Sequence, residues 1–196
     1  MPTNSTHRHF IFHKPYNCLS QFIYNGKRKS RKRLIGQFYN FPEGTMAIGR
    51  LDENSEGLLL MTTDGKVSEE IRSSKYEKEY WVQLDGMITD EAIELLKNGV
   101  EIGFGGMKYI TKPCKASKIT TPESPHILPR KIRHERHGPT SWASIIIREG
   151  KYRQIRKMTA AVGFPTLRLI RVRIGDIYLS INESEVVEVE NFNCSN

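Results

Sequence analysis

Residues 47–65, AIGRLDENSEGLLLMTTDG, contain the side chain whose position most favours chemistry. Asp52 lies in a charged, turn-rich segment that runs directly into the four apolar residues 58–61. An apolar run of this length is typical of a buried strand, so the carboxylate would stand at the end of a loop that a strand anchors. Three roles fit such a carboxylate: it binds a calcium ion, it caps a turn, or it takes part in a reaction.

The calcium hypothesis fails on spacing. From Asp52 onward the sequence DENSEG follows the start of an EF-hand loop, with oxygen-bearing side chains at positions 1, 3 and 5 and glycine at position 6. Position 5 is Glu56 rather than Asp or Asn, and position 12 is Thr63, where the loop needs a bidentate glutamate. Calcium binding is therefore excluded, whereas capping and catalysis both stay open at this point.

No other segment of the sequence indicates a metal or a nucleotide. His7, His9 and His13 alternate along a segment expected to be a strand or a frayed end, so we expect surface histidines rather than a set that converges on one ion. The sequence GLLLMTTDGK has bulky residues between its glycines and lacks the spacing of a phosphate-binding loop. We therefore predict that the protein holds no metal and requires no cofactor.

Positive charge is concentrated near the N-terminus. The net charge is +8, and residues 1–42 contain no acidic residue. The rest of the chain balances, with 22 basic and 22 acidic residues. The segment 27–33, KRKSRKR, holds six basic residues: Lys27, Arg28, Lys29, Arg31, Lys32 and Arg33. Such a cluster repels itself unless it is solvated or meets a polyanion, and the second alternative predicts binding to nucleic acid.

Length and composition limit the remaining classes. A chain of 196 residues can build one substantial core. It contains no apolar run near the roughly 18 residues that cross a membrane, and its first residues lack the apolar region of a secretory signal. Three cysteines lie far apart and fit neither a disulfide framework nor a zinc site. We expect a cytoplasmic protein in a reducing compartment.

The apolar patterns predict a mixture of strands and helices. The expected strands cover residues 9–14, 58–61, 79–86, 142–150, 166–176 and 186–192. The expected helices cover residues 67–73, 89–99 and 151–163. Residues 103–106 are expected to form a flexible turn, and residues 111–140 an irregular insertion. This mixture predicts an α+β fold.

Two of the expected helices carry informative side chains. The helix at 89–99 has Thr89 as an N-cap and Gly99 at its C-terminal end. The helix at 151–163 has Arg153, Arg156 and Lys157 at i, i+3 and i+4, so we expect these three cations to share one face. A basic helical face is a second place where the chain is predicted to meet phosphates.

Three segments in order resemble the motifs of one enzyme family. GRLDENSEGLLLMTTDG (49–65) resembles the signature of the pseudouridine synthases of the RsuA/RluB/RluE/RluF branch. KEYWV (78–82) resembles the second motif of that family, Lys-x-Tyr-x-Val, and EGKYRQIRKMTAAVGFPTLRLIRVRIGD (149–176) resembles its third. FHKPYNCLSQF (12–22) and PTSW (139–142) are most similar to the RluE-type members, which act on large-subunit ribosomal RNA.

The resemblance implies an isomerase that converts a uridine in RNA to pseudouridine without a cofactor. The similarity to the RluE-type members implies that this RNA is 23S ribosomal RNA. It implies the pseudouridine synthase fold, in which a mixed, mostly antiparallel sheet with flanking helices forms two lobes around a basic cleft. We expect one catalytic domain over residues 1–196, with an N-terminal lobe to about residue 75 and a C-terminal lobe from about residue 76. Many members of the family carry an N-terminal S4 RNA-binding domain, and we expect none in this chain. The expected protein is a monomer that meets free 23S RNA or a pre-ribosomal particle.

The resemblance also assigns roles to single residues. Asp52 is the carboxylate beside the ribose, where it stabilises positive charge, attacks C1′ or accepts a proton from C2′; the sequence does not choose among these. Arg156 would pair with that carboxylate, and Tyr80 would stack on the base or assist proton transfer. Leu169 matches the apolar position near the base, and Arg50 would displace the base or contact phosphate.

A uridine within a stem must leave the helix to reach Asp52. Phosphate contacts that offset this cost are expected from the 27–33 segment, from Arg153 and Lys157, and from the insertion residues Arg130, Lys131, Arg133 and Arg136. One rival function is an RNA-binding module without activity, which the presence of Asp52, Tyr80 and Arg156 disfavours. Another is a glycosylase or a deaminase, and a zinc deaminase would need a Cys-x-x-Cys that the chain lacks.

Overall fold

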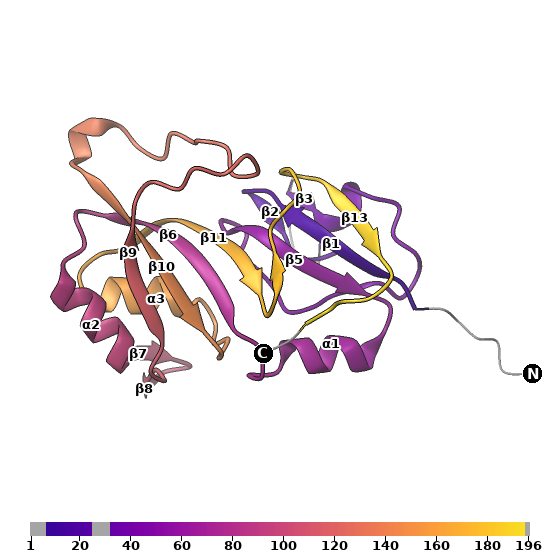
Figure 1. Ribbon diagram of the computed structural model, residues 1–196, viewed down its shortest axis with the longest axis horizontal. Coiled ribbons are helices and arrows are strands. Elements are labelled where there is room, and N and C mark those ends of the chain that lie inside the picture. The colour runs from indigo at the N-terminus through magenta and orange to yellow at the C-terminus, as the bar shows by residue number, and fades with distance from the viewer. Residues whose placement is uncertain (1–6, 25–31, 195–196) are drawn as a thin grey trace, which may run out of the picture.

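The computed structural model describes residues 7–24 and 32–194. Its centre is a nine-stranded sheet with the strand order β13-β1-β5-β11-β6-β10-β9, in which β4 also pairs with β5 and β12 with β11 (Figure 1). Every neighbouring pair is antiparallel except β5 and β11, which are parallel. The sheet is therefore mixed and mostly antiparallel, as predicted for the α+β pseudouridine synthase fold.

The strands of the large sheet are β1 (His9–Lys14), β4 (Met46–Ala47), β5 (Glu56–Thr62), β6 (Lys78–Asp85), β9 (Lys115–Ile119), β10 (Thr140–Ile147), β11 (Thr166–Ile174), β12 (Ile177–Tyr178) and β13 (Val186–Val189). Two small pairs lie outside it, β2 (Cys18–Leu19) with β3 (Arg33–Leu34), and β7 (Glu101–Phe104) with β8 (Met107–Ile110). The helices are α1 (Gly65–Arg72), α2 (Asp90–Asn98) and α3 (Gln154–Ala161), with short 3-10 turns at Ile35–Gln37 and Glu135–His137.

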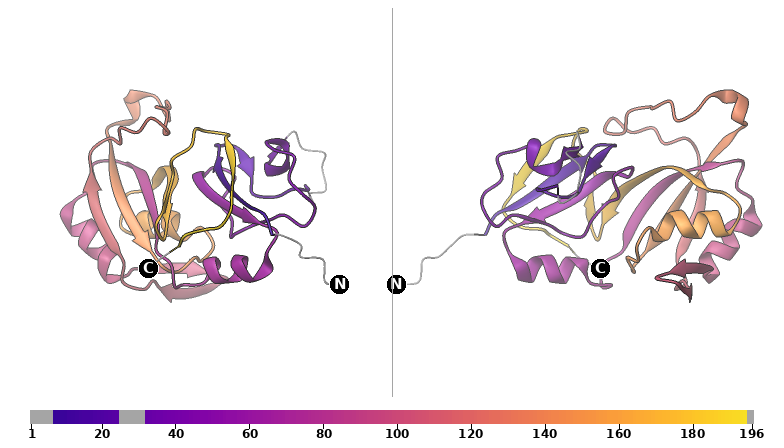
Figure 2. Two further views of the ribbon diagram at one scale, coloured as in Figure 1. Left: turned by 45° about the vertical axis from the view of Figure 1, so that its right-hand side comes forward. Right: turned by 180° about the vertical axis from the view of Figure 1, so that it is seen from behind.

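All three α-helices lie on one side of the sheet. Helix α1 lies beneath the half that contains β1, β5 and β13, whereas α2 and α3 lie beneath the half that contains β6, β9 and β10 (Figures 1 and 2). The segment between β9 and β10 crosses the opposite side. Residues of α1, α3 and β11 line a cavity on the helical side of the sheet.

Strand β5 explains the apolar run 58–61. Leu58 and Leu60 pack with the α1 residue Ile71 on one face, and Leu59 and Met61 pack with Phe10 on the other. All seven residues of the strand are buried. A strand covered on both faces needs apolar residues at consecutive positions, which is why its sequence shows no alternation.

The parallel contact between β5 and β11 depends on Gly57. Its backbone has φ +100°, and a Cβ at this position would lie 2.3 Å from the carbonyl oxygen of Arg171. Only glycine accepts both this conformation and this approach of another backbone. Because β5 and β11 are the central neighbours of the sheet order, Gly57 permits the junction of its two halves.

The predicted elements are confirmed with changes at their ends. Helix α1 begins at Gly65, because the Asp64 side chain accepts from the amides of Lys66 and Val67 as an N-cap. The predicted helix 151–163 is shorter, because the residue before α3, Arg153, has left-handed backbone angles of φ 52° and ψ 34°. Thr89 caps α2 as expected.

Three expectations for loops and side chains were wrong in part. The insertion 111–140 contains β9, and the glycine-rich turn at 103–106 is partly the end of β7. His9 and His13 are buried rather than at the surface; the Nδ1 atom of His9 lies 2.9 Å from Thr62 Oγ1, and that of His13 lies 3.0 Å from the Ile181 carbonyl oxygen. These rings are held by partners more than 50 residues away in the chain, which local pattern does not reveal.

The last strand of the chain lies beside the first. His9 of β1 is opposite Val189 of β13, so the half of the sheet built from N-terminal residues is completed by C-terminal ones. A division into lobes at about residue 75 stays a prediction.

Replacement of Gly57 by alanine is expected to destabilise the protein. The added Cβ meets the Arg171 backbone, and the positive φ alone costs about 1–2 kcal/mol for a residue with a Cβ, so we expect the free energy of unfolding to fall by more than about 2 kcal/mol. Gly65→Ala is the control, because Gly65 is exposed, opens α1 and has no neighbour within 4 Å. Urea unfolding of both variants measures the difference, and equal stabilities would contradict the assignment.

Candidate active site

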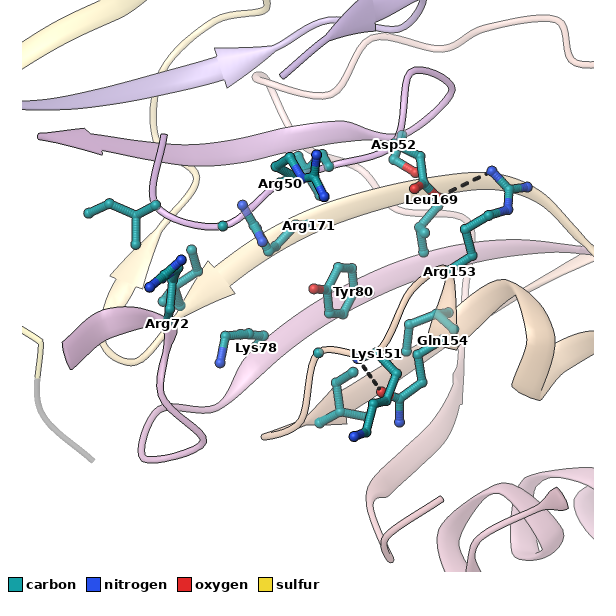
Figure 3. Close-up of a pocket in the computed structure, with 18 of the residues that line it drawn as sticks. Arg50, Asp52, Arg72, Lys78, Tyr80, Lys151, Arg153, Gln154, Leu169 and Arg171 are labelled. Atoms are coloured by element: carbon teal, nitrogen blue, oxygen red, sulfur yellow. Dashed lines mark hydrogen bonds and ion pairs between the residues drawn. The ribbon is translucent and has the colours of Figure 1, made fainter. Parts of the chain in front are cut away.

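A cavity of about 220 Å³ opens between α1 and α3 on the helical side of the sheet. Among the described residues that line it, six are basic and one, Asp52, is acidic. The basic residues are Arg50, Arg72, Lys78, Lys151, Arg153 and Arg171 (Figure 3). Its apolar lining comes from both halves of the molecule and includes Ile48, Ile71, Ile155, Leu169 and Ile174. This cavity is the predicted basic cleft.

Asp52 lies at one end of the cavity in the turn that precedes β5. Its carbonyl oxygen accepts a hydrogen bond from the Ser55 amide at 3.0 Å, which closes the turn. Its Oδ2 atom lies 3.4 Å from Nη1 of Arg153 and 3.6 Å from Nε of Arg156. Both distances exceed the 2.7–2.9 Å of a charge-assisted hydrogen bond. The carboxylate therefore lies between two cations without a short bond to either.

Arg156 stabilises the same turn through hydrogen bonds to Asn54 and Ser55. Its Nη2 atom donates to the Asn54 carbonyl oxygen at 2.8 Å and to Ser55 Oγ at 3.2 Å. Burial lowers the pKa of Arg156, Arg153 lowers it further, and Asp52 opposes both. Arg156 does not line the cavity; it fixes the backbone that presents Asp52 and supplies positive charge to the carboxylate.

Lys14 and Ser20 anchor the turn from the N-terminal side. The fully buried Lys14 ammonium donates to the carbonyl oxygens of Ser55 at 2.7 Å and Pro15 at 3.0 Å. Burial lowers the pKa of Lys14 to about 8. Ser20 Oγ donates to the Leu51 carbonyl oxygen at 2.8 Å and accepts from the Leu51 amide at 3.1 Å. The residues on both sides of Asp52 are thus fixed. The segment 12–22 was noted for its similarity, but sequence reasoning gave these two residues no role.

Tyr80 and Leu169 form a wall of the cavity. Tyr80 on β6 is opposite Arg171 on β11, and Leu169 on β11 is opposite Val82 on β6. Both side chains are buried at the cavity surface, and Leu169 lies next to Asp52 (Figure 3). Strand alternation on β6 puts Tyr80 on this face, as the sequence predicted.

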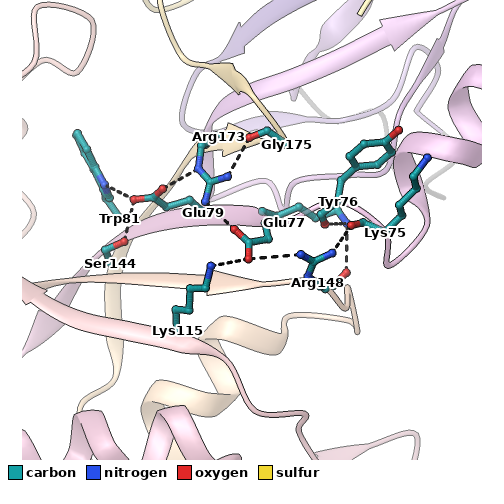
Figure 4. Close-up of polar contacts among 11 residues, drawn as sticks. Lys75, Tyr76, Glu77, Glu79, Trp81, Lys115, Ser144, Arg148, Arg173 and Gly175 are labelled. Atoms are coloured by element: carbon teal, nitrogen blue, oxygen red, sulfur yellow. Dashed lines mark hydrogen bonds and ion pairs between the residues drawn. The ribbon is translucent and has the colours of Figure 1, made fainter. Parts of the chain in front are cut away.

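A bulge in β11 decides which of its charged residues reach the cavity. Arg171 pairs with Tyr80 and Arg173 pairs with Glu79, so Val172 is an extra residue in the strand. Arg171 therefore faces the cavity, whereas Arg173 faces the other side of the sheet. There its Nε lies 2.9 Å from Glu79 Oε2 and its Nη2 lies 3.2 Å from Glu77 Oε2 (Figure 4).

The other predicted RNA-binding residues lie in different places. Arg50 and Arg153 line the cavity. Lys157 donates to the Gly103 carbonyl oxygen at 2.7 Å, away from the Asp52 turn. Lys32 pairs with Glu53 at 2.5 Å, and the guanidinium carbon of Arg33 lies 4.8 Å from the centre of the Phe38 ring. Lys27, Arg28, Lys29 and Arg31 lie outside the described residues.

Two insertion arginines form ion pairs within the protein. Arg130 Nη2 lies 2.8 Å from Oε1 of the buried Glu56, and Arg133 Nη2 lies 2.7 Å from Asp85 Oδ1. Glu56 also pairs with Arg168 at 2.8 Å. These ion pairs hold the segment between β9 and β10 against the sheet, and contact of Arg130 and Arg133 with RNA stays a prediction.

Among the cavity residues without a functional prediction, five have a long polar side chain: Arg72, Lys78, Lys151, Gln154 and Arg171. The Lys78 ammonium donates to the carbonyl oxygens of Ser73 and Tyr76, each at 3.2 Å. Lys78 and Arg171 lie within the segments that resemble the second and third motifs, and this was the signal that could have found them.

Within residues 7–24 and 32–194 no group of three His, Cys, Asp or Glu side chains is placed to hold a metal ion. Each helix in these ranges is too short or too polar to cross a lipid bilayer. The cavity is therefore characterised by a carboxylate, a tyrosine, an apolar wall and several cations.

The comparisons with known proteins assign the family. A family model described as RNA pseudouridylate synthase matches residues 8–161, most of the chain. The protein belongs to this family of RNA pseudouridylate synthases, and the prediction made from three motifs is confirmed.

Named relatives agree. The chain is 42% identical over 173 residues to the "Ribosomal large subunit pseudouridine synthase E" of Vibrio parahaemolyticus serotype O3:K6 (strain RIMD 2210633), covering 86% of this chain and 68% of that protein. It is 38% identical over 170 residues to the protein of the same name from Xanthomonas axonopodis pv. citri (strain 306), covering 85% of each. A solved structure described as "Crystal structure of pseudouridylate synthase" is similar with a TM-score of 0.70 and 28% identity, over 93% of this chain and 70% of that one.

Lys78 is expected to make stability depend on pH. Burial, with Arg171 and Arg148, lowers the pKa of Lys78 to about 8, whereas an unfolded lysine titrates near 10.4. Below about pH 8 the Lys78 side chain is protonated in both the folded and the unfolded protein, so the full free-energy cost of burying its charge is present. Between about pH 8 and 10.4 the unfolded chain binds more protons, so the Lys78 contribution to stability rises with pH.

We therefore expect the unfolding free energy of the wild-type protein to rise relative to that of Lys78→Met by up to about 1.4 kcal/mol per pH unit between pH 8 and 10. Lys14 is present in both proteins, so its contribution cancels. Urea unfolding at successive pH values measures the difference. Parallel stability curves would show that the Lys78 pKa is not lowered.

Proposed function

We propose that this protein converts a uridine of large-subunit (23S) ribosomal RNA to pseudouridine, with Asp52 as the catalytic carboxylate. The observation that supports the proposal most directly is the position of Asp52: it is the acidic residue among the described residues that line the cavity, it is 22% exposed, and two arginines lie near its Oδ2 atom. The named relatives are large-subunit enzymes, which supports the choice of RNA.

The reaction breaks the bond between C1′ and N1 and forms one between C1′ and C5. C5 loses a proton, N1 gains one, and nothing else enters or leaves. Stabilisation of positive charge at C1′, attack on C1′ and removal of a C2′ proton all need a carboxylate beside the ribose, and Asp52 occupies that place in this proposal. Arg153 and Arg156 place positive charge 3.4 and 3.6 Å from its Oδ2 atom.

The rest of the cavity fits a flipped pyrimidine. Tyr80 and Leu169 supply a flat and an apolar contact for the base. Arg50, Arg72 and Lys151 lie around the cavity where phosphates of the flanking nucleotides would run. Function as a monomer in the cytoplasm, on free RNA or a pre-ribosomal particle, belongs to the same proposal.

Replacement of Asp52 by asparagine is expected to abolish product formation while RNA binding persists. The amide keeps the size of the side chain but neither attacks C1′ nor accepts a proton, so we expect a loss of about 10³-fold or more. Asp90→Asn is the matched control, because the Asp90 side chain is 86% exposed at the start of α2. Wild type and both variants are incubated with unmodified 23S transcript, and pseudouridine is mapped by chemical labelling and reverse transcription.

Product from Asp52→Asn at the wild-type rate would refute the role of Asp52. Absence of product from the wild type on both the transcript and pre-ribosomal particles would refute the proposed substrate.

Neutralising Lys27, Arg28, Lys29 and Arg31 as glutamines is expected to weaken RNA binding and its dependence on salt. Removal of one phosphate contact lowers the slope of log K against log salt concentration by about 0.7–0.9, so removal of four corresponds to a change of about 3. Filter binding at several salt concentrations measures the slope. An unchanged slope would show that this cluster is only solvated.

A further inference from the structure

Arg171 has a hydrogen-bonding group that the fold does not use. The residue is 4% exposed, and its Nε atom donates to the Leu58 carbonyl oxygen at 2.7 Å. Its Nη2 atom is buried and has no hydrogen-bond partner within the described residues. Buried donors are rarely left unpaired, and an exception calls for an explanation such as a ligand. Arg171 lines the cavity, so a bound base would come within its reach.

The cavity is electrically polarised along β11. Its carboxylate, Asp52, lies beside Leu169, and Arg171 is two residues further along the strand, about 7 Å away at the rise of a strand. Lys78 lies beyond it (Figure 3). Burial lowers the pKa of Lys78, and the nearby cations Arg171 and Arg148 lower it further, so positive charge lies close to Lys78. This end of the cavity therefore favours an oxygen acceptor that carries partial or full negative charge.

On the basis of the proposed function, we infer that Arg171 Nη2 donates to a carbonyl oxygen of the flipped uracil and selects uracil against cytosine. Uracil carries two such oxygens, O2 and O4, on either side of N3. With C1′ fixed near Asp52, the far end of the ring points along the cavity toward Arg171. The other two β11 residues that line the cavity, Leu169 and Ile174, are apolar, so Arg171 is the residue of this strand that can offer the base a hydrogen bond.

The rotation of the base makes this single donor sufficient for the whole reaction. A half-turn about the axis through N3 and C6 brings C5 to the position of N1 and exchanges O4 with O2. A donor that holds one carbonyl oxygen before the turn therefore meets the other after it. A base that leaves with the electron pair of the broken bond carries its charge on these two oxygens, which strengthens the contact at the intermediate stage.

The same geometry excludes cytosine. Cytosine has a carbonyl oxygen at position 2 and an amino group at position 4. Whichever of the two faces Arg171 first, the amino group faces it at one of the two stages, and two donors then oppose each other. Arg171 is thus a specificity-determining residue that contacts the substrate.

A purely structural role is the alternative, because the Nε bond to Leu58 ties β11 to β5. Sulfur substitution of the substrate separates the two roles, since a thiocarbonyl is a weak acceptor. The test uses short RNA hairpins with the sequence around the mapped target uridine, carrying uridine, 2-thiouridine or 4-thiouridine there. The preference for uridine over each thio analogue is measured in single-turnover reactions with wild type, Arg171→Met and Arg173→Met.

Arg173 is the matched control, because it lies on the same strand but faces Glu79 and Glu77 on the other side of the sheet (Figure 4). We expect the wild type and Arg173→Met to share one preference for uridine. In Arg171→Met this preference should shrink by roughly 10-fold or more for both analogues. The comparison between variants cancels the intrinsic reactivity of the thio bases.

Equal preferences in wild type and Arg171→Met would overturn the inference even if the variant is slow. Whether or not Arg171→Met folds, a wild type indifferent to both sulfur atoms would also overturn the inference. Neither result touches the proposed function, which is tested separately by pseudouridine formation on ribosomal RNA and by Asp52→Asn.

Discussion

The close contact of two backbones at Gly57 is the constraint on which the rest of the site depends. Strands β5 and β11 run parallel at the centre of the large sheet, and they approach so closely that a Cβ at Gly57 would meet the Arg171 carbonyl group. The turn that carries Asp52 precedes β5, and Leu169 and Arg171 belong to β11. A single glycine thus brings the carboxylate from the first third of the chain beside residues more than 100 positions later.

Electrostatics then fixes the turn. Lys14 donates to its carbonyl groups from one side and Arg156 from the other, while Arg153 and Arg156 flank the carboxylate itself. Cations that are buried among carbonyl dipoles need those groups, and the turn needs the cations, so the arrangement is mutually stabilising. The carboxylate is left without a short hydrogen bond to either arginine. It is oriented by charge while its oxygens stay available to a substrate.

Much of the fold followed from local pattern. The apolar run 58–61, the alternation of β6 and the Thr89 cap each encode their own element, because burial and capping depend on neighbours in sequence. The family motifs pointed to Asp52, Tyr80 and Leu169, which the structure places in one cavity. The left-handed Arg153, the pair of Arg130 with Glu56 and the support from Lys14 were not predicted. Arg130 and Lys14 act through partners about 40 to 75 positions away, and the backbone angles of Arg153 do not follow from its residue type.

The extra residue Val172 separates two arginines that regular alternation would have placed together. In an even strand, positions 171 and 173 share a face; with the bulge, one arginine enters the cavity and the other joins the carboxylates of Glu77 and Glu79. The bulge thus places the two arginines on opposite faces of the sheet. The charge of Arg173 is neutralised by carboxylates, whereas Arg171 lies in the cavity, where its charge can attract a substrate. The length of this strand, rather than its composition, sets that division: one additional residue, and no change in net charge, separates the arginine of the cavity from the arginine that binds the carboxylates.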